Sequence, residues 1–261
     1  TGKMFTKYRK GGTMGVKTIN QIINEKSSSV TTTQERTAGT SNLEIETYYY
    51  DEREYLVGKY YNLSNIIPEL HKRTFENSNT KSKKEKEHKE SFERYCENFE
   101  DIKIKGLGII MLGNAGNGKT FYSDCIFNNL LSKGYVVYRT TISSLFQRFK
   151  DTYNPNSKVN IKDLIKELKE CDLIVLDDLG SENISENWGE ENIYNLLDFL
   201  TTNNISLILS SNLSLEDLKN HLSVKKDDKL FDRIREKCKL FVFDWKSRRG
   251  ETYKKEFEEL Y

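Results

Sequence analysis

The sequence predicts an α/β fold in which helices flank a parallel sheet. Between residues 101 and 261, short apolar segments typical of buried strands alternate with segments whose apolar residues recur at helical spacing. The strands lack polar alternation, which indicates that helices cover both faces of the sheet. A glycine-rich loop that follows the first strand and leads into a helix supports the same fold class.

Each expected strand is a run of four or five residues in which apolar side chains dominate. Leu173–Leu176 is wholly apolar and ends at two aspartates, and another strand is followed by Ser210, Ser211 and Asn212. Runs of this length are typical of strands in globular proteins. The five expected strands are residues 108–112, 135–139, 173–176, 205–209 and 240–243.

The segments between the strands carry the helical pattern. Ile161, Leu164 and Leu168, for example, lie on one face of an expected helix. Gly134 ends the helix that follows the glycine-rich loop, and Pro155 separates two later helices. The six expected helices cover residues 121–131, 142–150, 161–169, 193–200, 215–222 and 230–237.

The glycine-rich loop matches the pattern G-x-x-x-x-G-K-[ST] and consists of Gly113, Asn114, Ala115, Gly116, Asn117, Gly118, Lys119 and Thr120. Its glycines let successive backbone N–H groups point at one anion, and the following helix adds its positive dipole end. Lys119 can reach the β- and γ-phosphates, and the Thr120 hydroxyl can bind Mg²⁺. The strand-loop-helix setting therefore predicts a site for the phosphates of a nucleotide with Mg²⁺.

Polar residues follow two other strands of the predicted sheet. Asp177 and Asp178 come after Leu173–Leu176, and Asn212 follows the strand at 205–209. Ligands bind at the carboxyl ends of parallel strands, so we expect these residues to meet the loop. Asp177 is placed to hold Mg²⁺, directly or through water, and Asp178 to orient an attacking water. Asn212 either contacts that water and the γ-phosphate or forms an Asx turn.

Composition excludes several other classes of protein. The 41 basic and 40 acidic residues nearly balance, so any nucleic-acid surface must be local. The four cysteines lie far apart, which argues against a zinc site and a disulfide framework. No apolar run is long enough to cross a membrane and no signal peptide is recognisable, so we expect a cytoplasmic protein without a membrane partner.

The chain divides into three expected regions. Residues 1–70 form a small helical or flexible N-terminal region, in which 27–41 is rich in Ser and Thr and expected to be flexible. Residues 1–13 are expected to be a cloning remnant, with Met14 as the natural start. Residues 71–100 contain a connecting amphipathic helix with Phe92, Tyr95, Cys96 and Phe99 on one face. Residues 101–261 form the nucleotide-binding domain.

Several stretches resemble the bacterial replicative-helicase loaders of the DnaC/DnaI type, which are AAA+ ATPases. The transposition helper IstB is a close relation of these loaders. The resemblance covers about residues 70–250. It rests on residues 73–77, 95–99, 106–108 before the loop, 176–182 with Trp188, 210–213, 232–234 and 245–249.

The resemblance implies roles for further residues. Asn212 corresponds to the sensor 1 residue, Arg233 to the arginine finger that acts on a neighbouring subunit, and Arg249 to a sensor 2-like arginine. Arg248 is the adjacent alternative to Arg249. The family binds single-stranded DNA on the helix pair after the second strand, where the candidates are Phe146, Arg148, Phe149 and Lys150. An aromatic ring beside a cation suits base stacking and phosphate contact, although packing of the rings within the domain is the alternative.

The chain departs from the family pattern in three respects. Phe121 and Tyr122 follow Thr120 in place of the usual His-Leu, a change that should leave nucleotide binding intact. The N-terminal region has no cysteine cluster, so we expect no zinc-bearing docking domain. The chain ends soon after the last strand, so we expect no separate lid domain.

The expected function is that of an ATP-dependent loader that binds a DnaB-type replicative helicase and delivers it onto single-stranded DNA. We expect slow ATP hydrolysis, modulated by DNA or the partner, and ATP-dependent self-association into a ring or spiral. The N-terminal region would dock the helicase.

Two other functions share most of these features. A transposition helper of the IstB type would have a similar core and a different partner, and a nucleotide-gated adaptor would bind DNA and protein with little hydrolysis. A small-molecule kinase would need an arginine-bearing lid, for which no clear candidate exists. A GTPase is disfavoured because the sequence contains no N-K-x-D motif.

Overall fold

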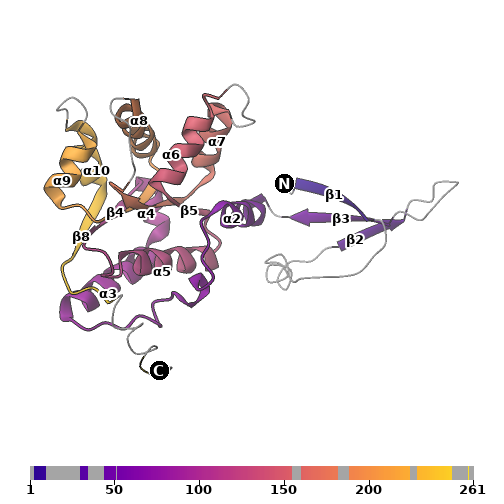
Figure 1. Ribbon diagram of the computed structural model, residues 1–261. Coiled ribbons are helices and arrows are strands. Elements are labelled where there is room, and N and C mark those ends of the chain that lie inside the picture. The colour runs from indigo at the N-terminus through magenta and orange to yellow at the C-terminus, as the bar shows by residue number, and fades with distance from the viewer. Residues whose placement is uncertain are drawn as a thin grey trace. The chain divides into compact units, whose positions relative to one another are not determined.

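The computed structural model forms two compact units, residues 1–59 and 60–261 (Figure 1). Each unit is described separately. The structure describes residues 3–9, 30–34, 44–50, 52–154, 160–181, 188–223, 228–248 and 258.

The second unit is built on a five-stranded parallel sheet, as the apolar runs predict. The strand order is β5-β6-β7-β4-β8, so β4, which leads into the glycine-rich loop, lies between β7 and β8. The strands are β4 (Gly108–Gly113), β5 (Val137–Thr141), β6 (Leu173–Leu179), β7 (Ser206–Ser211) and β8 (Cys238–Phe243). The second strand begins two residues later than expected, at Val137.

Helices cover both faces of this sheet. Figure 1 shows α3 and α5 on one side and α6 to α10 on the other. The chain between these helices and strands is short, which is typical of an α/β domain. The helices are α2 (Glu52–Leu63), α3 (Lys83–Glu97), α4 (Phe99–Lys105), α5 (Lys119–Ser132), α6 (Ile142–Asp151), α7 (Ile161–Glu170), α8 (Trp188–Thr202), α9 (Leu215–Leu222) and α10 (Lys229–Lys237), with a 3₁₀ turn, η1, at Leu70–Lys72.

The amphipathic helix expected within residues 71–100 is α3. Ser82 caps it by accepting a hydrogen bond from the backbone N–H of Glu85. Phe92, Tyr95 and Cys96 are buried, in the pattern that the helical spacing predicts. The helix stops before Phe99, which begins α4 and is also buried.

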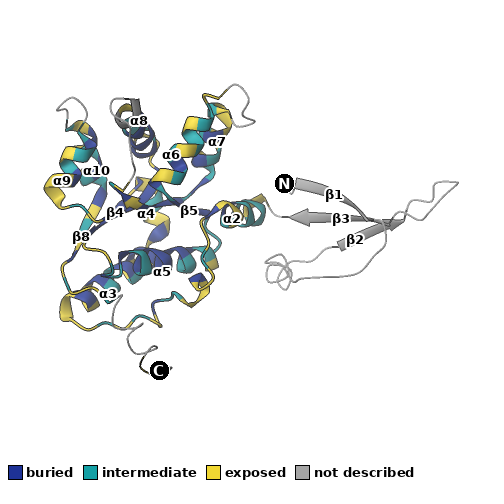
Figure 2. Cartoon of the chain, viewed as in Figure 1, coloured by how far each residue is buried: buried dark blue, intermediate teal, exposed yellow. Residues whose placement is uncertain are grey.

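An aromatic cluster joins α3 to the last strand of the sheet. The ring of Phe92 lies 4.7 Å from that of Phe241, and Phe243 lies 4.9 Å from Trp245. Figure 2 shows the buried residues concentrated along the strands and on α5. Burying large aromatic side chains is a major favourable term in folding, so this cluster fixes the end of β8 beside the loop.

The first unit differs from the expectation of a helical or flexible region. It contains a three-stranded antiparallel sheet with β3 (Glu44–Tyr50) between β1 (Lys3–Arg9) and β2 (Val30–Gln34). The strand β2 lies within residues 27–41, which were expected to be flexible; residues 27–29 and 35–41 lie outside the described residues. Three consecutive threonines in β2 and three tyrosines in β3 explain the strands, since β-branched and aromatic residues favour extended backbone.

No helix in the described parts of the chain is both long enough and apolar enough to span a bilayer.

Candidate nucleotide-binding site

The glycine-rich loop connects β4 to α5, which begins at Lys119. Gly113, Gly116 and Gly118 all have positive φ angles, of 148°, 83° and 95°. A Cβ atom on Gly113 would lie 2.2 Å from the backbone oxygen of Phe243, so only glycine fits there. The loop thus has the backbone of an anion cradle ahead of a helix N-terminus, which suits the phosphates of a nucleotide.

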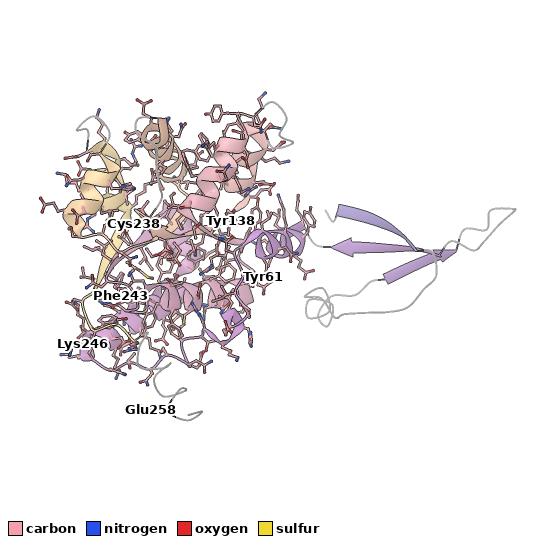
Figure 3. All side chains as sticks on the ribbon, viewed as in Figure 1. Tyr61, Tyr138, Cys238, Phe243, Lys246 and Glu258 are labelled. Carbon is pink, nitrogen blue, oxygen red and sulfur yellow. The ribbon has the colours of Figure 1, made fainter. Side chains whose placement is uncertain are left out.

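The end of β8 holds this loop in place. Phe243, labelled in Figure 3, is the last residue of β8, and its backbone oxygen accepts a hydrogen bond of 2.8 Å from Asn117 Nδ2. Asn117 Nδ2 also donates to the backbone oxygen of Trp245 at 2.6 Å, and Trp245 Nε1 donates to the backbone oxygen of Asn117 at 2.8 Å. The backbone N–H of Arg248 donates to Gly116 O at 3.0 Å. The Asn117 side chain therefore shapes the loop.

Lys119 lies across the loop with only 6% of its surface exposed. Its ammonium group donates hydrogen bonds to Gly113 O at 2.5 Å, Asn114 O at 3.0 Å and Asn212 Oδ1 at 2.8 Å. Asn212 is exposed and follows the last residue of β7. Two residues 93 positions apart in the sequence thus meet at the carboxyl edge of the sheet, as the strand order requires.

Asp177 and Thr120 form a pair of oxygen groups beside Lys119. Thr120 Oγ1 donates to Asp177 Oδ1 at 3.4 Å, and the Ser210 hydroxyl donates to the same oxygen. Asp177 is buried near the end of β6. A carboxylate and a hydroxyl are the oxygen ligands that Mg²⁺ prefers, so the residues present fit a magnesium nucleotide.

The backbone of Asp178 departs from the extended conformation of β6. Its φ angle is +59°, and the pairing register of β6 with β7 shifts between Leu176 and Leu179. The backbone N–H of Asp178 donates to Ser210 Oγ at 3.2 Å, and its side chain is exposed. A left-handed aspartate is uncommon, and such backbone is characteristic of functional sites.

The three candidate arginines have different surroundings. Arg233 on α10 donates to the Asp198 carboxylate and to Thr202 Oγ1, both on α8. Arg248 donates to Glu85 Oε2 at 2.5 Å and to Asn79 O at 2.7 Å. Arg249 lies outside the described residues.

The candidate DNA-binding residues lie on α6 and have unequal access to solvent. Arg148 donates to Glu167 Oε2 at 2.5 Å and to the Tyr138 hydroxyl at 3.2 Å, so the structure commits it to contacts within the domain. Lys150 is exposed, whereas Phe146 and Phe149 are half-buried. Tyr153, which sequence analysis missed, is 59% exposed and its ring lies 5.5 Å from that of Phe149.

Sequence analysis also missed two residues that contact Asp177. Ser210 was noted only as part of a strand end, although its hydroxyl contacts the carboxylate. Arg139 lies in β5 with Nη2 at 3.7 Å from Asp177 Oδ2. An arginine inside an apolar strand is itself a signal, because a buried arginine needs a charged or polar partner.

Similarity to known proteins extends over most of the chain. Residues 50–256 match the model of the family described as IstB-like ATP binding protein. The replicative helicase loader DnaC of Escherichia coli strain K12 is 27% identical over 198 residues, which are 76% of this chain and 77% of that protein. The protein of the same name from Buchnera aphidicola subsp. Baizongia pistaciae is 29% identical over 149 residues; this match covers 57% of the present chain and 58% of the relative.

The fold is similar to that of a solved helicase loader. A crystal structure of the DnaC helicase loader superposes with a TM-score of 0.59 at 23% identity and covers 67% of this chain and 99% of that one. The predicted α/β fold with a parallel sheet flanked by helices is thereby confirmed. Because the family model matches well over half of the sequence, including the whole glycine-rich loop and Asp177, this chain belongs to the family of IstB-like ATP-binding proteins.

Proposed function

We propose that this protein is an ATP-dependent loader that binds a DnaB-type replicative helicase and places it on single-stranded DNA. The observation that carries the proposal is the contact of Lys119 with Asn212 beside the Thr120–Asp177 pair. These four residues fit a magnesium nucleotide, and relatives of the chain are named replicative helicase loaders. The nucleotide site supports ATP use, and the relatives' names support the helicase as partner.

Each group of the site has its own role in ATP hydrolysis. Backbone N–H groups of the loop and Lys119 bind the phosphates, and Thr120 and Asp177 hold Mg²⁺. The bound metal supplies positive charge to the phosphate oxygens. Asp178 orients the attacking water, and Asn212 contacts the water and the γ-phosphate.

Arg233 completes the site of a neighbouring subunit. Phosphoryl transfer gains from an arginine that neutralises transition-state charge, typically by about 10³–10⁵ in rate. Its contacts with Asp198 and Thr202 leave it 37% exposed on α10, where a second copy of the chain can reach it once it leaves those partners. The loader therefore works as an ATP-dependent ring or spiral, and hydrolysis releases it from the loaded helicase.

Single-stranded DNA binds along α6. Tyr153 with Phe149 offers a stacking surface, and the exposed Lys150 offers a phosphate contact. Arg148, held by Glu167, orients the helix instead of contacting DNA directly. The N-terminal region of residues 1–70 docks the helicase, and we expect residues 1–51 to supply the contacts.

The test is a pull-down of the replicative helicase of the same host with Mg²⁺ and ATP. Residues 1–51 are deleted in the comparison variant, because Tyr60 and Leu70 are buried in the second unit and must be kept. We expect the full chain to retain the helicase and the shortened chain to lose it while still binding ATP. Absence of binding by the full chain in every nucleotide state would contradict the loader function and favour a transposition helper of the same fold.

A further inference from the structure

Four charged side chains are joined in series by three ion pairs. Asp124 on α5 lies between Arg73 and Arg139, and Arg139 also faces Asp177. The side chains of Arg139 and Asp177 are each 6% exposed and that of Asp124 is fully buried. Two positive and two negative groups balance, which is what permits charges to remain in the interior.

The guanidinium group of Arg139 uses each nitrogen for a different partner. Nε donates to Asp124 Oδ1 at 2.5 Å, Nη1 donates to the backbone oxygen of Asn65 at 2.6 Å, and Nη2 lies 3.7 Å from Asp177 Oδ2. The planar fork of arginine cannot turn toward one partner without leaving another. Its orientation toward Asp177 is therefore fixed by Asp124 and Asn65.

The two oxygens of Asp177 face different groups as a result. Oδ1 accepts from Thr120 and Ser210, on the side where Mg²⁺ would be held, whereas Oδ2 faces Arg139. An ion pair on Oδ2 opposes rotation of the carboxylate. We propose that Arg139 is a positioning residue for Asp177, which keeps Oδ1 turned toward Thr120 for metal binding. This inference rests on the proposed function, because it requires that Asp177 and Thr120 hold the magnesium of a bound nucleotide.

The same arginine anchors the segment that follows α2. Its backbone N–H donates to Ser64 Oγ at 2.9 Å, and its backbone oxygen accepts from the N–H of Asn65 at 2.9 Å. With the contact from Nη1 to Asn65 O, three hydrogen bonds join Arg139 to residues 64 and 65. Within the second unit, the orientation of Arg139 thus depends on residues 64 and 65 as well as on Asp124.

The expected loss of Mg²⁺ affinity can be judged from other metal sites in proteins. Removing a group that orients a metal ligand typically weakens metal affinity about 10- to 100-fold. Arg139→Gln removes the charge that faces Asp177. Arg73→Gln is the matched control, because Arg73 contacts the same Asp124 at 2.6 Å, whereas the arginine that faces Asp177 is Arg139.

The experiment measures how much Mg²⁺ is needed for half-maximal binding of a fluorescent ATP analogue to the full chain. We expect Arg139→Gln to need at least about 10-fold more Mg²⁺ than the natural protein, and Arg73→Gln less than about 3-fold more. Arg139→Lys, which keeps a positive charge but loses the fork, is a second test if the glutamine variant does not fold, and we expect it to need several-fold more Mg²⁺. Thermal unfolding of each variant checks that it is folded.

The outcomes separate this inference from the proposed function. If Arg139→Gln and Arg139→Lys need no more Mg²⁺ than Arg73→Gln, Arg139 does not position Asp177, even though the protein binds magnesium nucleotide. If analogue binding by the natural protein does not respond to Mg²⁺, the proposed role of Asp177 and Thr120 itself is wrong.

Discussion

The ammonium group of Lys119 donates a hydrogen bond of 2.8 Å to Asn212 Oδ1, which joins the start of α5 to the end of β7. Asn212 is exposed, whereas Lys119 is buried. A γ-phosphate that takes Lys119 as its partner must share or replace this contact. In the proposed function, this contact is the one that would change when a γ-phosphate binds.

Asn212→Ala should impair hydrolysis more than binding. Loss of one preorganised polar group that acts in the transition state typically lowers kcat by about 10²–10³-fold. We expect phosphate release to fall by about that factor while the affinity for a fluorescent ATP analogue changes less than severalfold. Asn220→Ala, at an exposed position on α9, is the control and should retain full turnover. An equal loss of binding and turnover would mean that Asn212 mainly shapes the loop.

Arg233→Ala and Asp178→Asn should complement each other when mixed. Each alone should lose ATP turnover, the arginine variant by about a thousandfold or more. In a mixed assembly, a subunit with an intact site can receive Arg233 from a neighbour that carries Asp178→Asn. Phosphate release by the mixture well above that of either variant is the expected result, and no gain on mixing would show that Arg233 does not act on a second subunit.

Gly108→Ala should destabilise the second unit. The added Cβ would lie 2.2 Å from the backbone oxygen of Leu207 and 2.8 Å from Cys238 Sγ, because β4 packs between β7 and β8. Overpacking of this kind typically costs about 1–3 kcal/mol in the free energy of unfolding. Gly58→Ala is the comparison, since no atom lies within 4 Å of its added Cβ and alanine favours the helix α2. The urea concentration at the midpoint of unfolding should be lower for Gly108→Ala than for Gly58→Ala. Equal midpoints would contradict the packing argument.

Stability should fall in mild acid because of His88. Its ring lies 5.1 Å from Phe241 and 5.5 Å from Trp245, and burial lowers its pKa below the ordinary 6.5, with Lys84 acting in the same direction. Three carboxylates oppose the shift without reversing it, those of Asp244, Glu87 and Glu85. The unfolded chain therefore takes up a proton at a higher pH than the folded protein does.

The sign of the effect follows from that difference. The free energy of unfolding should be independent of His88 above pH 6.5, decline as the pH falls from there to the folded-state pKa, and level off below it. Urea unfolding over this pH range gives the free energy of unfolding of the natural protein and of His88→Phe. The difference between these two free energies should change in favour of the variant as the pH falls. His71→Gln, at an exposed position, should follow the natural protein. A constant gap between His88→Phe and the natural protein would rule out titration of His88.

The fold of the second unit was predictable because its signals are local. The apolar strand at residues 173–176 and the helical spacing of Phe92, Tyr95 and Cys96 each follow from a short window of sequence. The glycine-rich loop is likewise a contiguous motif. The helix and strand ends were off by a few residues, as at β5, because tertiary contacts decide where an element stops.

The remaining features depend on contacts between distant residues. The ion pair of Arg139 with Asp124 joins β5 to α5, and the contact of Ser210 with Asp177 joins β7 to β6. No periodicity within one segment predicts such pairs. The prediction for the first unit was wrong for another reason. The richness of residues 27–41 in Ser and Thr was interpreted as flexibility, although the β-branched threonines of β2 and the tyrosines of β3 favour strands.

The hydrogen bonds from Asn117 to the backbone of Phe243 and Trp245 have a consequence for synthesis of the chain. The loop motif leaves the ribosome 126 residues before the strand end that holds it. Domains fold during synthesis only as their partner segments emerge. A nascent chain that extends only as far as β7 contains every residue of the motif but lacks the strand that shapes it. The loop therefore gains the hydrogen bonds that hold its backbone only after β8 has joined the sheet.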